Sequence, residues 1–141
     1  MTIASILREK GGTVATAAAD MSVHDIVAML HDQRIGALIV AENGRIAGVV
    51  SERDVVRCLH QKGVAILEAQ ARDIMTAPVL TVAPGDSIGS AMELMTARRI
   101  RHLPVVDGES LVGIVSIGDL VKRRIDDAER EAADLKGYIA S

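Results

Sequence analysis

The sequence predicts an α/β (α+β) fold built from two copies of one β-α-β-β-α unit, and three observations support it. A shift of 65 positions aligns residues 16–57 with residues 81–122 without a gap, and the identities gather around one local pattern. In each copy a segment with helical hydrophobic periodicity precedes two short apolar runs. Apolar residues make up 49% of the 141 residues, mostly Val, Ile, Ala and Leu, a mixture that suits sheets packed on helices.

Each copy is expected to begin with a short strand and an amphipathic helix. The strands are predicted at 13–16 and 78–82, ahead of two serines that can cap helices, Ser22 and Ser87. Apolar residues at i, i+3, i+4 and i+7 behind each serine predict a helix of about three turns. These residues are Val23, Ile26, Val27 and Leu30 in the first copy and Ile88, Ala91, Met92 and Met95 in the second.

A hairpin and a second helix complete each copy. The paired runs are 37–40 with 46–50, joined by Glu42-Asn43-Gly44, and 103–106 with 111–115, joined across Asp107-Gly108. Asn-Gly and Asp-Gly favour the positive φ angles of tight hairpins. The second helices are expected after Ser51 and Ser116. Since one copy of about 60 residues would leave much of its sheet uncovered, we expect the copies to pair with pseudo-twofold symmetry.

The expected organisation is repeat 1 at residues 1–62, repeat 2 at 63–124 and a helical extension at 125–141. A short helix within 1–7 is expected to match residues 71–75, and the linker 61–71 is expected to pack. Apolar residues of the extension, spaced 3 or 4 apart, form a heptad-like seam: Ile125, Ala128, Ala132, Leu135 and Ile139. The seam fits either docking on another subunit or folding back on its own domain, and both alternatives stay open.

Composition excludes several classes of function. With Tyr138 as the one aromatic residue and a net charge of −3, the chain offers neither stacking platforms nor a basic field for nucleic acids. The single Cys58 and the isolated histidines give no metal-ligand spacing. No apolar run approaches the roughly 20 residues of a membrane span, and no signal peptide is recognised, so a cytoplasmic location is expected. No residues combine a base, a nucleophile and an oxyanion site, so no catalytic residues are assigned and an enzyme is not expected.

The strongest chemical candidate is Gly-x-Val-Ser-x-x-Asp, found at 48–54 and 113–119 where a strand turns into a helix. Helix N-termini present free N–H groups to phosphate. A carboxylate there can accept two hydrogen bonds from vicinal ribose hydroxyls, and the preceding glycine allows close approach of a flat base. Ser-x-x-Asp before an apolar run is also the capping-box pattern. Capping and ligand binding therefore both remain open for this motif.

A second candidate is the segment Arg98-Arg99-Ile100-Arg101-His102-Leu103-Pro104-Val105. Guanidinium groups bind phosphate bidentately, although cations at a helix end also complement its dipole. Arg101 and His102 stand where the first copy has Gly36 and Ala37. The two copies therefore predict unequal sites.

The doubled motif, the Arg-His-Leu-Pro-Val-Val-Asp-Gly segment and the 65-residue spacing resemble a tandem pair of CBS domains, named after cystathionine β-synthase. The resemblance covers about residues 3–124. It implies two clefts that bind adenosine-containing ligands such as AMP, ADP, ATP, S-adenosylmethionine or NAD(H), with no catalytic cofactor. It also implies ribose-binding aspartates at Asp54 and Asp119, with hydroxyl contacts from Ser51 and Ser116.

Each implied cleft combines residues from both copies. One joins Ile35, Gly36 and Ala37 to Ile114, Ser116, Gly118 and Asp119, with Arg101 as its phosphate ligand. The other joins Ile100, Arg101 and His102 to Val49, Ser51, Arg53 and Asp54. We therefore expect a regulatory, signal-transducing homodimer that senses adenine nucleotides and acts on an unidentified protein. The alternative is a protein-interaction or scaffold module with vestigial clefts.

Overall fold

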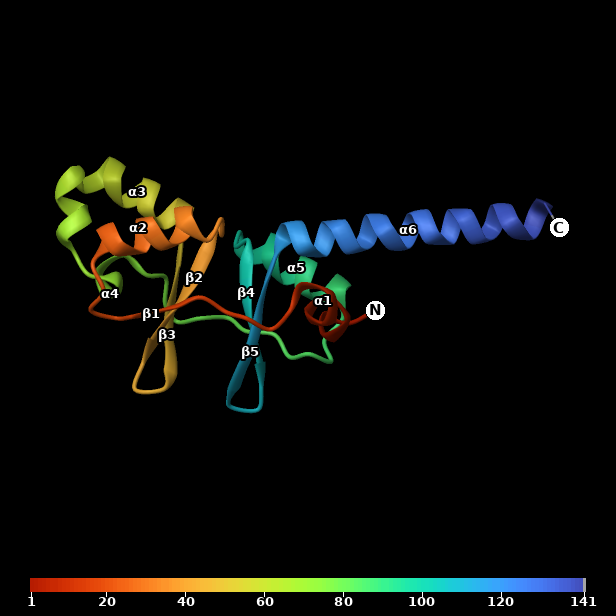
Figure 1. Ribbon diagram of the computed structural model, residues 1–141, viewed down its shortest axis with the longest axis horizontal. Coiled ribbons are helices and arrows are strands. Elements are labelled where there is room, and N and C mark those ends of the chain that lie inside the picture. The colour runs from red at the N-terminus through yellow and green to blue at the C-terminus, as the bar shows by residue number, and fades with distance from the viewer. Residues whose placement is uncertain (141) are drawn as a thin grey trace. The chain divides into compact units, whose positions relative to one another are not determined.

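The computed structural model describes residues 1–140 and divides into two compact units (Figure 1). We call Val14–Leu80 the repeat-1 unit, and Met1–Thr13 together with Thr81–Ser141 the repeat-2 unit. Each unit has its own cluster of buried apolar side chains. The units differ from the expected ranges 1–62 and 63–124 because the segment ahead of each repeat packs on the other repeat.

The repeat-1 unit follows the predicted order of elements. Its elements are β1 (Thr16–Ala18), α2 (Val23–Asp32), β2 (Ala37–Glu42), β3 (Arg45–Ser51), α3 (Glu52–Lys62), the 3-10 helix η1 (Val64–Glu68) and α4 (Ala71–Ile74). The sheet order is β1-β2-β3, with β1 parallel and β3 antiparallel to β2. Ser22 caps α2 through a 3.1 Å hydrogen bond from the Asp25 N–H, as predicted. Asn43 and Gly44 form the hairpin turn with φ of 53° and 75°, also as predicted.

The repeat-2 unit has the same core elements with one strand fewer. They are α1 (Ile3–Lys10), α5 (Ile88–Arg98), β4 (His102–Asp107), β5 (Ser110–Ser116) and α6 (Ile117–Ala140), with β4 antiparallel to β5. Ser87 caps α5 as predicted, since its hydroxyl accepts from the Ser90 N–H at 3.0 Å. The turn residue Gly108 has a φ of 63°.

The first strand of each copy is where the sequence prediction was wrong. The strand expected at 13–16 lies at Thr16–Ala18, where it pairs with β2 from Ile39 to Ala41. The strand expected at 78–82 is reduced to a single bridge from Val82 to Val105. Pro78 and Pro84 flank this segment and have no N–H to contribute to a ladder.

The two short helices exchange partners between the repeats. Helix α1 begins the chain, yet Ile3 and Ile6 are buried in the core of the repeat-2 unit. Helix α4 precedes the second repeat, yet Ala71 and Ile74 are buried in the core of the repeat-1 unit. The short helix expected at 71–75 is present as α4, and the linker 61–71 packs as expected, with Ile66 buried.

Two glycines allow these helix segments to lie directly on the strands. A Cβ atom on Gly48 would lie 2.5 Å from the Met75 Sδ, and one on Gly113 would lie 2.5 Å from the Leu7 Cδ2. The space that we expected to admit a flat base is thus occupied by side chains of the same unit. Both glycines serve packing in this structure.

Helix α6 continues without a break for 24 residues, far beyond the body of the repeat-2 unit (Figure 1). Its Leu120 is fully buried, whereas Ile125, Leu135 and Ile139 are 52%, 60% and 76% exposed. The fold-back alternative for the heptad-like seam is therefore wrong. Within residues 1–140, no helix has both the length and the apolar run that crossing a membrane requires.

Candidate ligand-binding site

The strand–helix junctions of the two units are built alike. Ser51 and Ser116 end strands, and each donates its backbone N–H to Oδ2 of the aspartate three residues on, at 2.8 Å in both units. In return, the N–H groups of Asp54 and Asp119 donate to the serine hydroxyls at 3.2 and 3.1 Å. The capping function of the repeated motif is confirmed in both copies.

Beyond the cap, both oxygens of the Asp54 carboxylate bind side chains of its own unit. Its side chain is buried, and Oδ1 accepts a hydrogen bond from the Thr76 hydroxyl at 3.0 Å and pairs with the Arg57 Nη1 at 2.9 Å. The Ser51 hydroxyl adds a third side-chain contact, donating to Oδ2 at 3.0 Å. A ribose hydroxyl could reach this carboxylate only by breaking one of these contacts.

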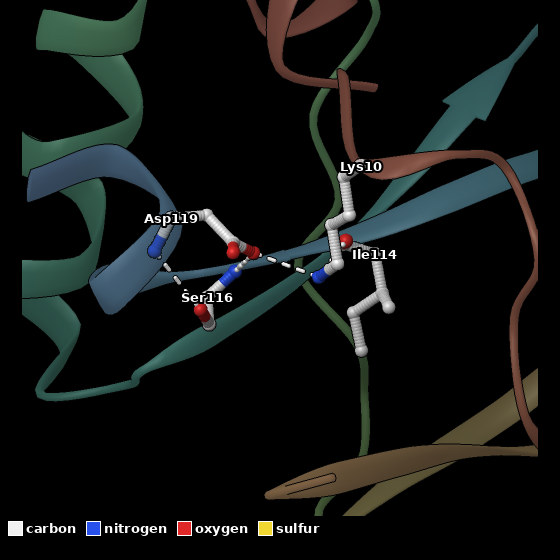
Figure 2. A network of polar contacts seen from close by, with 4 residues as sticks. All are labelled: Lys10, Ile114, Ser116 and Asp119. Carbon is white, nitrogen blue, oxygen red and sulfur yellow. Dashed lines mark hydrogen bonds and ion pairs between the residues drawn. The ribbon is translucent and has the colours of Figure 1, made fainter. Parts of the chain in front are cut away.

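The Asp119 carboxylate is different, because its side chain is 26% exposed and it keeps one oxygen open (Figure 2). Among the described residues, all its hydrogen bonds fall on Oδ2, which accepts from the Ser116 N–H and from the Lys10 Nζ at 2.7 Å. The same Lys10 ammonium donates to the Ile114 carbonyl at 3.0 Å. Oδ1 is therefore available to a ligand donor.

Burial pulls the pKa of Asp119 upward, but other contacts outweigh it. The hydrogen bond and the charge of Lys10, together with the hydrogen bonds from Ser116, hold the pKa of this carboxyl below its ordinary value. Asp119 is consequently an anion at neutral pH, which is the state that accepts two hydroxyl hydrogen bonds.

An open pocket of about 200 Å³ lies beside Asp119, between α1 and the first turns of α6. It is lined by Ile6, Glu9, Lys10, Asp119, Lys122, Arg123 and Asp126. Drug-sized ligands fill pockets of roughly 300–1,000 Å³. This pocket has room for a ribose or a phosphate but not for a whole nucleotide.

Within each unit, the residues that precede the hairpin lie against the junction. In the repeat-1 unit, Ala37 pairs with Ser51, and the Gly36 carbonyl accepts from the Glu52 N–H at 3.0 Å. In the repeat-2 unit, His102 pairs with Ser116 in the same way. The Arg101 carbonyl accepts from the N–H of the next residue, Ile117, at 2.8 Å.

The structure therefore brings the predicted site residues together as two groups, one in each unit. Ile35, Gly36 and Ala37 accompany Val49, Ser51, Arg53 and Asp54, while Ile100, Arg101 and His102 accompany Ile114, Ser116, Gly118 and Asp119. The Arg101 side chain is exposed, as a phosphate ligand must be. The clefts implied by the resemblance combine residues of both copies, and those combinations stay predictions.

Sequence reasoning missed Lys10 and Thr76, the two residues that make the junctions unequal. The signal was present in the repeat, because residues 10–11 align with 75–76 at the 65-residue shift. Lys10 is the last residue of α1 and Thr76 lies two residues after α4, and each reaches the junction of the other repeat. Thr76 bonds there through its backbone to Val49 and through its hydroxyl to Asp54, while the Lys10 ammonium reaches Ile114 and Asp119.

Replacing Lys10 by methionine should lower the free energy of unfolding by about 0.5 kcal/mol near neutral pH, since both partners of the ion pair are partly exposed to solvent. The pKa of Asp119 is lower in the folded than in the unfolded chain, so this stability is present above the unfolded pKa and is lost as the pH falls through the folded one. The free energies of unfolding of the two proteins in urea should therefore converge as the pH is lowered through the folded pKa of Asp119. A constant difference across this range would contradict the ion pair.

Comparison with known proteins finds CBS-domain proteins by family model, by sequence and by structure. The family model of the CBS domain matches residues 12–61 and 71–126. The solved CBS-domain containing protein ATU1752 from Agrobacterium tumefaciens is 35% identical, with a TM-score of 0.86 over 88% of this chain and 99% of that chain. The mitochondrial CBS domain-containing protein CBSX3 of Arabidopsis thaliana is 34% identical over 98% of this chain and 71% of its own length.

A more distant structure shares the fold. The CBS domain pair of protein MJ0100, solved in complex with 5′-methylthioadenosine and S-adenosyl-L-methionine, is 22% identical with a TM-score of 0.80. It covers 90% of this chain and 98% of that chain.

Proposed function

Since this chain belongs to the CBS-domain family, we propose that it is a regulatory module that binds an adenosine-containing ligand at the Ser116–Asp119 junction. The observation that carries the proposal is the contrast between the two aspartates. The Asp54 carboxylate is buried and both its oxygens are engaged, whereas Oδ1 of Asp119 is open and the side chain is partly exposed. The second repeat therefore provides the ribose-binding carboxylate.

The chemistry around Asp119 suits a phosphorylated adenosine. A ribose hydroxyl can donate to Oδ1, and the first turn of α6 offers the positive end of a long helix. Arg101, exposed at the start of β4, supplies a guanidinium that can hold a phosphate bidentately. The adenosine moiety is what AMP, ADP, ATP and NAD(H) have in common with the two ligands of the MJ0100 domain pair.

In this proposal the module regulates a partner protein and does not catalyse a reaction. Ligand binding shifts the balance between two conformations of a cytoplasmic homodimer, and the shift is limited by the ligand's difference in affinity for them. The partner is a protein that the sequence leaves unidentified.

Isothermal titration calorimetry with adenosine, AMP, ATP, NADH and S-adenosylmethionine tests the proposal. At least one ligand should bind, and Asp119→Ala should weaken it about 10- to 100-fold, since hydrogen bonds to a charged group contribute about 1.5–3 kcal/mol. Arg98→Ala is the control, because Arg98 lies in the last turn of α5 and outside the junction. Arg101→Ala should weaken AMP but not adenosine.

Two outcomes would overturn the proposal. One is the absence of heat and of a melting shift with every ligand. The other is an equal loss of affinity in Asp119→Ala and Arg98→Ala, which would mean that the ribose site is elsewhere.

The second candidate function is a protein-interaction module, and one observation favours it. Beyond Arg124, every seam residue in the described part of α6 is exposed: Ile125, Ala128, Ala132, Leu135 and Ile139.

A further inference from the structure

Helix α6 packs on its own unit with one side only. Leu120 is fully buried in the core, and Arg123 is 15% exposed, with hydrogen bonds to Glu9 at 3.0 Å and to Asp127 at 3.3 Å. These residues are spaced 3 and 4 apart and lie on one face of the helix. The opposite face is therefore turned away from the repeat-2 unit.

That opposite face carries a continuous apolar seam. It begins four residues earlier than the sequence predicts, at Val121, which is 40% exposed. The seam residues are spaced alternately 4 and 3 apart: Val121, Ile125, Ala128, Ala132, Leu135 and Ile139. With Ile125 at heptad position a, Ile139 also falls at a and Leu135 falls at d. β-Branched residues at a and leucine at d favour two-stranded, parallel coiled coils.

The charged residues beside the seam indicate which way a partner helix runs. Arg124 and Glu131 occupy g positions, and Glu129 and Lys136 occupy e positions. In a parallel pair, each g residue faces the e residue of the partner's next heptad. Arg124 then meets Glu129 of the partner subunit, and Glu131 meets Lys136 of the partner subunit. Both pairs are of opposite charge, and twofold symmetry repeats them.

An antiparallel pair of the same helices would be repulsive. When the same apolar layers are aligned, e positions face e positions and g positions face g positions. Glu129 would then lie against Glu129 of the partner subunit, and Glu131 against Glu131 of the partner subunit. Like charges at these positions destabilise the pairing.

We propose that α6 pairs in parallel with α6 of a second copy of this chain, over residues Val121 to Ile139, as a short two-stranded coiled coil. The contact does not involve the Ser116–Asp119 junction, so it goes beyond the proposed ligand binding. An isolated helix of this length is marginal in water. Here Leu120 and Arg123 fix the start of α6 on a folded unit, which lowers the entropy cost of ordering the helix on association.

Disulfide trapping on the full chain tests which face of α6 forms the contact. Ala132→Cys puts a thiol in the seam, and Ala133→Cys puts the same thiol one residue away, outside the seam. Cys58 stays in place because it is buried. In a parallel pair the two residues at 132 face each other within the Cα separation of about 4.4–6.8 Å that a disulfide spans. Under mild oxidation, the covalent dimer should form about tenfold faster in Ala132→Cys. Equal rates, or no dimer in either variant, would overturn the proposal.

A charge exchange in the Ala132→Cys background tests the orientation. Glu131→Lys places like charges against Lys136 of the partner subunit and should slow the cross-linking several-fold at low salt. The double variant Glu131→Lys with Lys136→Glu should restore the rate, since the pair is then reversed but intact. A double variant as slow as the single one would exclude the parallel pairing. Calorimetric affinity for the nucleotide should be unchanged in all four variants, so this test and that of the ligand site fail independently.

Discussion

Replacing Asp54 by alanine should lower the free energy of unfolding by about 3 kcal/mol, whereas Asp119→Ala should cost only about 1 kcal/mol. Both substitutions remove the carboxylate of a capping box. The buried Asp54 carboxylate also accepts from the Thr76 and Ser51 hydroxyls and pairs with Arg57, and these contacts tie α3 to the segment after α4. Losing these three contacts, where Asp119 has only the Lys10 contact to lose, accounts for the larger cost.

Urea unfolding followed by far-ultraviolet circular dichroism measures both variants. Thr76→Val serves as a control of similar shape that deletes the single contact to Oδ1 and should cost about 1 kcal/mol. Equal losses in Asp54→Ala and Asp119→Ala would show that the two carboxylates are equivalent. That result would remove the physical basis for assigning the ligand to the second repeat.

Leu120→Ala should destabilise the repeat-2 unit by about 3 kcal/mol. Leu120 is fully buried among Ile3, Val115 and the other apolar residues of that core, so truncating it leaves a cavity at the point where α6 joins the unit. The residue also follows Asp119 directly, and α6 contacts both α1 and α5 around it. Leu120 is therefore the main anchor of the long helix.

Val56→Ala is the control for this prediction. Val56 lies on α3 outside the seam and is 65% exposed, so its truncation should cost about 0.5 kcal/mol. Unfolding in urea should resolve the difference between the two variants. Similar losses would indicate that α6 is not anchored through Leu120.

The elements that could be predicted from the sequence are those with local causes. Ser22 and Ser87 cap helices through hydrogen bonds to residues three positions away, and Asn43-Gly44 forms its turn within four residues. The short first strands have no such local cause. Thr16–Ala18 is a strand because it pairs with β2 some twenty residues later, and the corresponding segment at Val82 forms only a bridge. Their bounds depend on pairing with distant residues, which hydrophobic periodicity in the sequence does not predict.

The repeated motif predicted where the two junctions lie but not how they differ. Ser-x-x-Asp located both junctions, because the cap is local. The inequality of the two aspartates comes from Thr76, 22 residues from Asp54, and from Lys10, 109 residues from Asp119. A duplicated motif cannot reveal which copy is open when the deciding contact comes from a segment outside it.

The exchange of short helices also sets an order of assembly on the ribosome. The repeat-1 unit is one continuous stretch and can fold once Leu80 has emerged. Helix α1 is synthesised before both repeats, but Ile3 and Ile6 are buried only in the repeat-2 unit. At translation speeds of about 5–20 residues per second, Lys10 waits roughly 5 to 20 s for Asp119. Helix α1 therefore stays uncovered until the second repeat is made, and its apolar face is a surface that a chaperone would meet.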